Sequence, residues 1–357
     1  MTTLLDDAIA LAKAHETPWP RDPAGDPPAG GAPWGVHQDD PPPYNRLRGP
    51  VHARGPQSGV VWRRGQPLAA WGEPARADLT FSVAKTCLAL LAGVAQADGL
   101  LPDEHEPVVT RLPGIGFDSD HNRAITWAML LEQTSEWEGT CFGLPDTVDR
   151  WRKVAQDPRP AGGPKGGARP LQAPGSHWEY NDVRINQLSL ALLHLWKRPL
   201  PEVFAERILQ PLHCQDQFRW EGYEQGWTLV DGRRLMSVPG GSHWGGGVSI
   251  SALDQSRIGL MLMHGGRVDG RQVLSSDWIA RMQQPCPVAP YYGYLVWLNQ
   301  GGHLFAAAPR SSWFAIGAGS SLTWIDAEHE LVCVLRWIDP ARSNDCIACI
   351  MAAIESR

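Results

Sequence analysis

A serine and a lysine stand three residues apart at the start of a long apolar run, in the segment FSVAKTCLALLAGVAQADG, residues 81–99. Of the five lysines in the chain, Lys85 is the one that follows a serine by three positions and lies in an apolar segment. Residues three apart share one face of a helix, so Lys85 can reach the hydroxyl of Ser82. A serine hydroxyl needs a base to become a good nucleophile, and the unpaired amides at a helix N-terminus can stabilise an oxyanion. The pattern therefore predicts a nucleophilic serine. A serine that caps the helix, followed by a lysine whose ammonium reaches solvent, is the structural alternative.

Two other segments could complete such a centre. The segment WEYNDVRIN, residues 178–186, places Tyr180 and Asp182 where a loop meets a helix. The segment FAIGAGSSLTWID, residues 314–326, places glycines inside what we expect to be one central strand. Glycine weakens a strand and usually marks the close approach of a ligand or of another backbone. These three segments are therefore candidates for one catalytic site.

In this order the segments resemble the motifs of the serine β-lactamase and penicillin-binding-protein superfamily, and they are most similar to those of class C β-lactamases and their esterase relatives. FSVAKT is similar to the family's Ser-x-x-Lys helix, and YND to its Tyr-x-Asn motif. GAGSS falls where the family has Lys-Thr-Gly or His-Thr-Gly on an inner strand. The resemblance covers roughly residues 55 to 355.

The resemblance implies a role for each motif residue. Ser82 would be acylated, Tyr180 would act as general base and later as the acid for the leaving group, and Lys85 would assist Tyr180 and shuttle the proton. The oxyanion hole would consist of the backbone amides of Ser82 and Ser320. The other residues that the resemblance places beside the substrate are Asp182, Gly317, Ala318 and Gly319.

Two positions depart from the family pattern. Asp182 stands where the family has asparagine, and an acid near Lys85 favours the charged ammonium, which leaves Tyr180 as the better base. Asp182 could instead pair with Arg184. Gly317 stands at the lysine of Lys-Thr-Gly, so no cation remains at that strand position to meet the carboxylate of a β-lactam. This favours an uncharged ester or amide, and a lysine introduced at Gly317 is expected to raise the turnover of β-lactams.

Three further residues are candidates for the substrate site. Trp137 lies in the segment QTSEWEG, which the resemblance places beside the pocket, and it could be a substrate wall or a packing anchor for its loop. His243 and Trp244 precede three glycines and could line the cleft. A single histidine in a turn more often has a structural role. Trp178 is expected to be a core residue.

The elements around these motifs predict a mixed α/β fold of the α+β type. Two apolar runs on either side of Arg64 and Gly65 predict a β-hairpin. Strand-like runs follow at 291–299, 311–326 and 330–339, and a helix at 344–356 closes the chain. The hairpin must pair with the C-terminal strands to bury its apolar face. We expect a β-lactamase/transpeptidase-like antiparallel sheet flanked by terminal helices, with a mostly helical region inserted at about residues 100–235.

The expected organisation has two parts. Residues 1–54 comprise a first helix, which ends before Pro18, and a segment rich in proline and glycine that lacks regular structure. Trp34 and Tyr44 favour a segment that wraps over the surface. Residues 55–357 form the hydrolase domain.

The composition excludes several classes of protein. A net charge of −6 without a basic stripe argues against a nucleic-acid binder. The N-terminus lacks the bases and the apolar core of a signal peptide, and no stretch reaches the length of a membrane span, so we expect a cytoplasmic protein without membrane contact. Seven cysteines fit that compartment as reduced residues. Cys346 and Cys349 lack the second pair that a zinc site needs, and we expect no metal and no cofactor.

These observations predict a serine hydrolase that acts through an acyl-enzyme on a carboxylic ester or small amide. A true β-lactamase or D-amino-acid peptidase would be marked by a cation at Gly317. A non-catalytic binding protein of the same fold would be marked by the loss of Ser82, Lys85 or Tyr180, and all three are present. The partner expected from the sequence is the small-molecule substrate, and the sequence does not give the oligomeric state.

Overall fold

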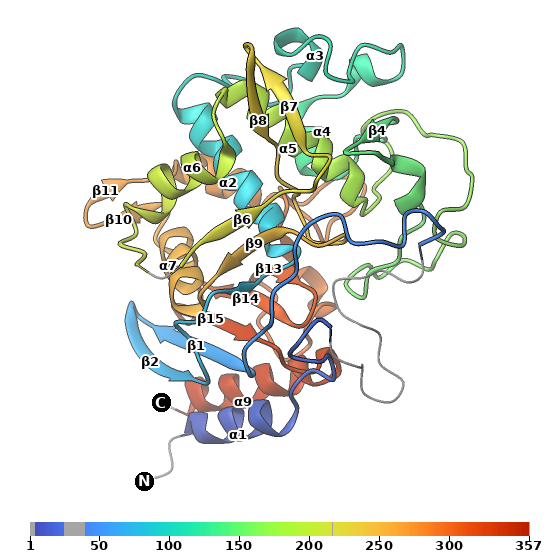
Figure 1. The fold of residues 1–357 in the computed structure, drawn as a ribbon. Coiled ribbons are helices and arrows are strands. Elements are labelled where there is room, and N and C mark those ends of the chain that lie inside the picture. Colours follow the sequence, from blue (N-terminus) through green and yellow to red (C-terminus); the bar gives the residue numbers. More distant parts are fainter. Residues whose placement is uncertain (1–3, 25–39, 216, 357) are drawn as a thin grey trace.

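The centre of the molecule is a six-stranded antiparallel sheet (Figure 1). The computed structural model describes residues 4–24, 40–215 and 217–356. Across the sheet the strands follow the order β12 (Trp297–Leu298), β13 (Trp313–Gly317), β14 (Ser321–Asp326), β15 (Leu331–Arg336), β1 (Ser58–Arg63) and β2 (Gln66–Trp71). The predicted hairpin is β1 and β2, and β1 pairs with β15 so that Val61 faces Cys333. The first strands of the domain therefore join the last ones, as the sequence predicts.

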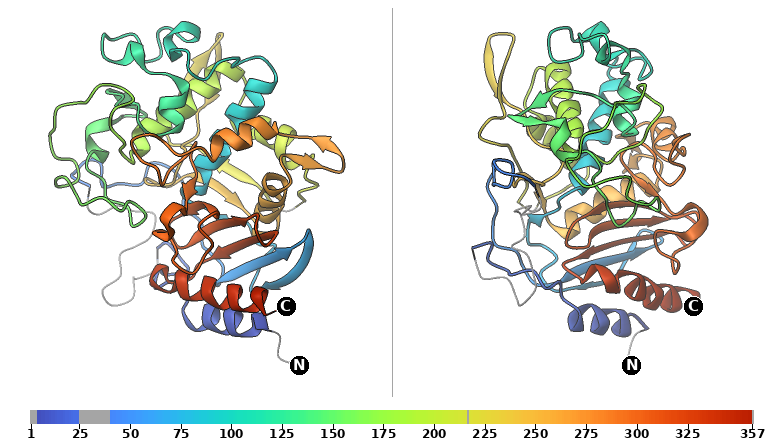
Figure 2. Two further views of the ribbon diagram at one scale, coloured as in Figure 1. Left: turned by 180° about the vertical axis from the view of Figure 1, so that it is seen from behind. Right: turned by 90° about the vertical axis from the view of Figure 1, so that its right-hand side faces the viewer.

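Helices cover both faces of this sheet because its inner strands are apolar on both sides. Every residue of β14 and β15 is buried. The terminal helices α1 (Leu4–Ala14) and α9 (Ser343–Glu355) lie side by side on one face, and α2 (Val83–Ala97) and α7 (Ala252–Met263) pack against the other (Figures 1 and 2). The antiparallel sheet flanked by terminal helices is thus confirmed.

The region beyond α2 is mostly helices and loops, as expected. Its helices are α3 (Val108–Arg111), α4 (Trp127–Leu131), α5 (Asp182–Trp196) and α6 (Leu200–Phe204), and a π-helical turn continues α6 over Ala205–Leu209. Small sheets border it: β4 (Thr140–Cys141) with β5 (Leu144–Pro145), β7 (Trp227–Val230) with β8 (Arg233–Met236), and β6 (Arg219–Glu221) with β9 (Gly247–Ile250) and β3 (Asp78–Leu79). The remaining strands are β10 (Arg267–Val268) and β11 (Arg271–Gln272), and the remaining α-helix is α8 (Ser276–Met282). Short 3-10 helices lie at Asn122–Ala124, Asp146–Asp149, Gln300–Gly302 and Pro340–Arg342. The region rests on the sheet through α2, which contacts both α5 and β13.

Two strand predictions are wrong in detail. The apolar run at 291–299 contributes only the two residues of β12. The segment 314–326 is not one strand with a kink but the hairpin β13–β14. Gly319 and Ser320 have φ values of 66° and 53°, and the Ser321 amide donates to the Ala318 carbonyl at 3.4 Å. Two consecutive positive φ values suit a tight hairpin turn, and this is why the glycine is there.

The N-terminal segment runs back along the sheet. Glu16 forms a β-bridge with Ile338, and the Thr17 amide donates to the Trp337 carbonyl at 2.8 Å. Tyr44 is half-buried and packs against the main core, whereas Trp34 lies outside the described residues. Among the helices in the described part of the chain, none is long and apolar enough to cross a membrane.

Candidate active site

Ser82 lies at the N-terminus of α2, and its side chain is turned toward Lys85. The Lys85 Nζ donates to the Ser82 Oγ at 2.8 Å, one helical turn away. In the described structure the Ser82 hydroxyl accepts no capping hydrogen bond from α2. Lys85 is 1% exposed, so its ammonium does not reach solvent. The arrangement is that of a paired serine and lysine, and the capping alternative does not apply.

Asp182 is the immediate counter-ion of Lys85. Its Oδ1 lies 2.6 Å from the Lys85 Nζ, and its Oδ2 lies 3.1 Å from an Nη of Arg152. The alternative pairing with Arg184 is not formed, because Arg184 contacts Glu136 at 2.8 Å instead. Asp182 is itself buried and is absent from the described lining of the cavity at Ser82, so the structure places it behind the site rather than against a substrate.

Arg152 is a residue of the site that sequence reasoning missed. It follows a short 3-10 turn (Asp146–Asp149) and lies 3.1 Å from Asp149 as well as 3.1 Å from Asp182. Burial opposes the charge of all three groups. Even so, Asp149 and Asp182 raise the pKa of Arg152, while Arg152 and Lys85 hold the pKa of Asp182 well below its ordinary value. Burial dominates at Asp149, whose pKa is raised. The sequence held one clue, because a buried acid at a normally neutral motif position requires a cation beside it.

Tyr180 lies between these cations and an aromatic wall. Its ring stacks on Trp297 with a centroid distance of 5.7 Å and an interplanar angle of 24°. The Lys85 Nζ lies 4.6 Å from the ring centroid, and the Arg152 Cζ lies 5.4 Å from it. Trp178 is fully buried behind Tyr180, as predicted. The ring is therefore held in a fixed orientation, with two positive charges beside it.

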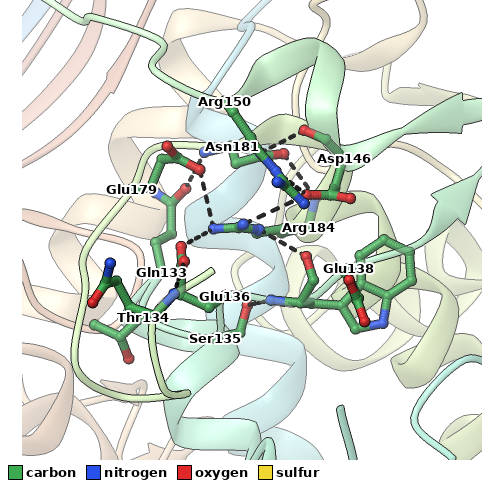
Figure 3. A network of polar contacts seen from close by, with 12 residues as sticks. Gln133, Thr134, Ser135, Glu136, Glu138, Asp146, Arg150, Glu179, Asn181 and Arg184 are labelled. Carbon is green, nitrogen blue, oxygen red and sulfur yellow. Dashed lines mark hydrogen bonds and ion pairs between the residues drawn. The ribbon is translucent and has the colours of Figure 1, made fainter. Parts of the chain in front are cut away.

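A buried ionic network fixes the backbone on both sides of Tyr180 (Figure 3). Asn181 accepts the amides of Val183 and Arg184, which caps α5, and its amide group donates to the Asp146 carbonyl at 3.0 Å. The Glu179 carboxylate accepts the Trp151 amide at 2.9 Å. Asn181 and Glu179 thereby join the Tyr180 segment to the loop that carries Arg152.

The centre of this network is Glu136. Its carboxylate contacts Arg169 at 2.6 Å and Arg184 at 2.8 Å. Although burial opposes ionisation, these arginines lower the pKa of Glu136 to about 2. Three arginines (Arg150, Arg169, Arg184) face three acids (Glu136, Asp146, Glu179) here, so the buried charges are balanced. Because each buried charge has a partner of opposite charge, this network can remain buried and hold the Tyr180 segment in place.

Ser82 and Tyr180 open onto a cavity of about 370 Å³. Gly317, Ala318, Gly319 and Ser320, which form the end of β13 and the turn after it, line the same cavity. The structure therefore brings together the three motifs that the sequence singled out. The assignment of the second oxyanion donor to the Ser320 amide stays a prediction.

Gly317 is required by a close backbone contact. A β-carbon built on Gly317 would lie 2.0 Å from the Thr80 carbonyl oxygen and 3.0 Å from the Ser82 nitrogen. The end of β13 thus lies directly against the backbone that carries the serine. This contact overturns the expectation that a lysine at Gly317 would simply add a cation, since any side chain there must displace β13 or Ser82.

Trp137, His243 and Trp244 are not among the described residues that line this cavity. The Trp137 indole donates to the Gly116 carbonyl at 2.8 Å and anchors its loop, as the packing alternative expects. His243 Nε2 lies 2.9 Å from an Asp40 carboxylate oxygen, to which the Trp244 indole also donates at 3.0 Å. His243 and Trp244 therefore hold the N-terminal segment, and this is why they are turned away from the substrate site.

One cluster of described residues has metal-binding side chains. Asp326, Glu328 and His329 lie together at the turn between β14 and β15. Asp326 accepts the Glu328 amide at 3.0 Å and lies 2.7 Å from the His329 Nδ1. These contacts stabilise the turn, and the cluster is not part of the described cavity lining at Ser82.

Comparisons with known proteins agree with this geometry. Residues 57–337 match the family model described as Beta-lactamase. The fold is similar to that of a Bacillus anthracis protein provisionally assigned as a 6-aminohexanoate-dimer hydrolase, with 16% identity, a TM-score of 0.60, and 84% of this chain and 78% of that chain covered. It is also similar to EstCE1, a hydrolase with promiscuous acyltransferase activity, with 17% identity, a TM-score of 0.58, and 86% and 93% of the two chains covered. A D-stereospecific amidohydrolase from Streptomyces sp. has 16% identity, a TM-score of 0.55, and 87% and 95% covered. No curated protein sequence gave a match. At these identities the solved structures show a shared fold.

Proposed function

The chain belongs to the beta-lactamase family, and from this membership we propose that it is a serine hydrolase that cleaves a carboxylic ester or small amide through an acyl-enzyme. The observation that carries the proposal is the 2.8 Å hydrogen bond between the Lys85 Nζ and the Ser82 Oγ, at a helix N-terminus that opens onto a cavity. A nucleophile paired with a polar partner at such a position is what acyl transfer requires.

Tyr180 is the proposed general base. Asp182 lies 2.6 Å from Lys85 and favours its charged ammonium, which can donate a hydrogen bond but cannot accept a proton. The positive charges of Lys85 and Arg152 beside the ring would stabilise negative charge on Tyr180. Tyr180 would accept the Ser82 proton as the oxygen attacks the carbonyl carbon, and would then protonate the leaving alcohol or amine.

The backbone amides would stabilise the oxyanion of each tetrahedral intermediate. The Ser82 amide is one proposed donor, and an amide of the turn after β13, assigned by the resemblance to Ser320, is the other. Water would then attack the acyl-enzyme with Tyr180 again as base, which releases the acid and restores Ser82.

The charges at the cavity favour an uncharged substrate. Arg152 is the charged side chain among the described lining residues, and it already contacts two carboxylates. A charge-assisted hydrogen bond is worth about 1.5–3 kcal/mol. A β-lactam carboxylate without such a partner should therefore react roughly tenfold or more slowly than an ester that needs none.

Intact-mass spectrometry tests the covalent step. A fluorophosphonate probe should add one adduct to the wild-type protein, on the peptide that contains Ser82. Ser82→Ala should remain unlabelled, whereas Ser343→Ala, a matched change in the same cavity lining, should label like wild type. Equal labelling of Ser82→Ala would refute the assignment.

Comparable kcat/KM values for nitrocefin and p-nitrophenyl acetate would instead favour the alternative of a true β-lactamase.

The cytoplasmic location expected from the sequence is part of this proposal. All seven cysteines are free, which suits a reducing compartment.

A further inference from the structure

A residue outside the matched family region lines the catalytic cavity. The family model begins at residue 57, yet Trp19, from the segment after α1, contributes to the same cavity as Ser82 and Tyr180. The family motifs say nothing of this segment. The contribution of this segment to the cavity therefore follows from the contacts of Trp19.

Trp19 packs beside the start of α2 and the turn after β13. Its ring lies 5.6 Å from Phe81, the residue before Ser82, and 6.5 Å from Trp337, with edge-on geometry in both cases. A β-carbon built on Gly319 would lie 3.3 Å from the Trp19 ring, so the indole also covers the turn after β13. Such edge-on aromatic contacts favour one ring orientation.

The backbone of Trp19 is anchored by a buried arginine. An Nη of Arg54 donates to the Trp19 carbonyl at 2.5 Å, and another contacts the Glu16 carboxylate at 2.6 Å. The Arg54 side chain is 2% exposed and its guanidinium lies 5.1 Å from the Trp337 ring centroid. The segment is thus tied to the end of β15, and Trp19 is a fixed wall rather than a loose side chain.

The wall that Trp19 completes is apolar. The other large apolar side chains that line the same cavity are Val154, Trp297, Leu304, Phe305, Ile316 and Leu322. The cavity of about 370 Å³ is near the lower end of the range for small-molecule sites. A site of this size and character has room for an apolar group of a few carbon atoms.

We infer that Trp19 is a specificity-determining residue, and that the substrate is an ester or small amide that carries an apolar group of several carbons next to the scissile bond. The inference rests on the proposed function and names the substrate class of the same site. Each methylene that leaves water for an apolar site should raise kcat/KM about fourfold, which corresponds to ~0.8 kcal/mol. The gain should depend on Trp19.

The test compares esters of different length on the full chain. The acyl series is p-nitrophenyl acetate, butanoate and hexanoate, and the alcohol series is methyl, butyl and benzyl acetate. Wild type should show kcat/KM rising about tenfold or more along at least one series. Trp19→Ala should lose most of the rise, so that its loss in kcat/KM relative to wild type grows with the length of the ester. Trp19→Leu keeps an apolar side chain beside Phe81, and it should lose only part of the rise in kcat/KM with ester length. This second variant distinguishes a loss of specificity from misfolding of the alanine variant.

Trp227→Ala is the matched control, because Trp227 is an exposed tryptophan of β7 that lies in a different surface groove. Trp227→Ala should show the same dependence of kcat/KM on ester length as wild type in both series. Two outcomes would overturn the inference: a wild-type kcat/KM that does not change along either series, or an equal loss of kcat/KM on all esters in both Trp19 variants. In either case Ser82 labelling and acetate turnover would still support the proposed hydrolase. Absence of labelling and of all ester turnover would refute the proposed function and this inference with it.

Discussion

Replacing Asp182 by asparagine removes one negative charge from a buried cluster and leaves its shape unchanged. The carboxylate lies 2.6 Å from Lys85 and 3.1 Å from Arg152, and its side chain is 3% exposed. In Asp182→Asn these two cations would face a neutral amide. In Arg152→Gln, Asp182 and Asp149 each lose one of the cations that face them. The double variant removes one charge of each sign and leaves the neutral asparagine that the family motif has at this position.

The size of the effect follows from the burial. Removing one partner of a buried ion pair costs about 3–5 kcal/mol, and Asp182→Asn should lose that much of the free energy of unfolding at neutral pH. Arg152→Gln should lose less, about 1.5–3 kcal/mol, because Lys85 still faces Asp182. The double variant should be more stable than Asp182→Asn by about 1 kcal/mol or more, since coupled sites in contact are not additive.

Urea unfolding and kcat/KM for p-nitrophenyl acetate measure both consequences. Asp182→Asn should lose on the order of 10²-fold in kcat/KM. The double variant should recover only part of that loss, because Lys85 alone would then support negative charge on Tyr180. Because the pKa of Asp182 is lowered, its contribution to stability is fully present above its ordinary pKa of 3.8 and is lost as the pH falls below that value. The stability gap between wild type and Asp182→Asn should therefore narrow only in acid.

Asp149→Asn is the control for this cycle. Asp149 lies at the same 3.1 Å from Arg152, but the ion pairs that it forms among the described residues are with Arg152, Lys165 and His243 and not with Lys85. This variant should keep more of its stability and of its activity than Asp182→Asn, because burial raises the pKa of Asp149 and opposes its charge. If the losses of Asp182→Asn and Arg152→Gln simply add in the double variant, in stability and in rate, then Arg152 does not compensate Asp182 and the reasoning fails.

Three further changes test the support of the site. Tyr180→Phe should keep its resistance to urea and lose on the order of 10²-fold in kcat/KM for p-nitrophenyl acetate, and a loss below tenfold would count against Tyr180 as the base. Glu136→Gln should cost roughly 3 kcal/mol of unfolding free energy at neutral pH, because paired arginines outweigh burial and hold the pKa of Glu136 at about 2. That difference should disappear in urea titrations as the pH falls from 4.5 toward 2. Gly317→Ala should lower kcat on the order of 10²-fold, because its β-carbon would lie 2.0 Å from the Thr80 oxygen and must shift the site; an unchanged kcat would show that β13 moves away freely.

The parts of the fold that could be predicted depend on local patterns. The apolar run after Ser82 and the turn at Arg64 and Gly65 are signals within a few residues, and both gave the correct element. The pairing of β1 with β15 followed because an apolar hairpin face must be buried. The turn after β13 was missed because a glycine in a strand and a glycine in a hairpin turn give the same letters, and only the backbone φ values distinguish them.

The residues that surround the motifs could not be predicted, because long-range packing alone brings them to the site. Arg152 and Trp19 come from two segments that are poor in regular structure, one after a 3-10 turn and one after α1. Under the proposed function the motifs would supply the atoms that react, whereas Arg152 supplies a counter-charge and Trp19 an apolar part of the cavity lining. Charge balance constrains one of them, since a buried cluster that contains Lys85, Asp182 and Asp149 is balanced by one further cation, Arg152. The wall at Trp19 has no such constraint, since an apolar cavity tolerates many side chains of similar size. The chemistry of the site should therefore be fixed by the matched family region, while its choice of substrate should change with the N-terminal segment.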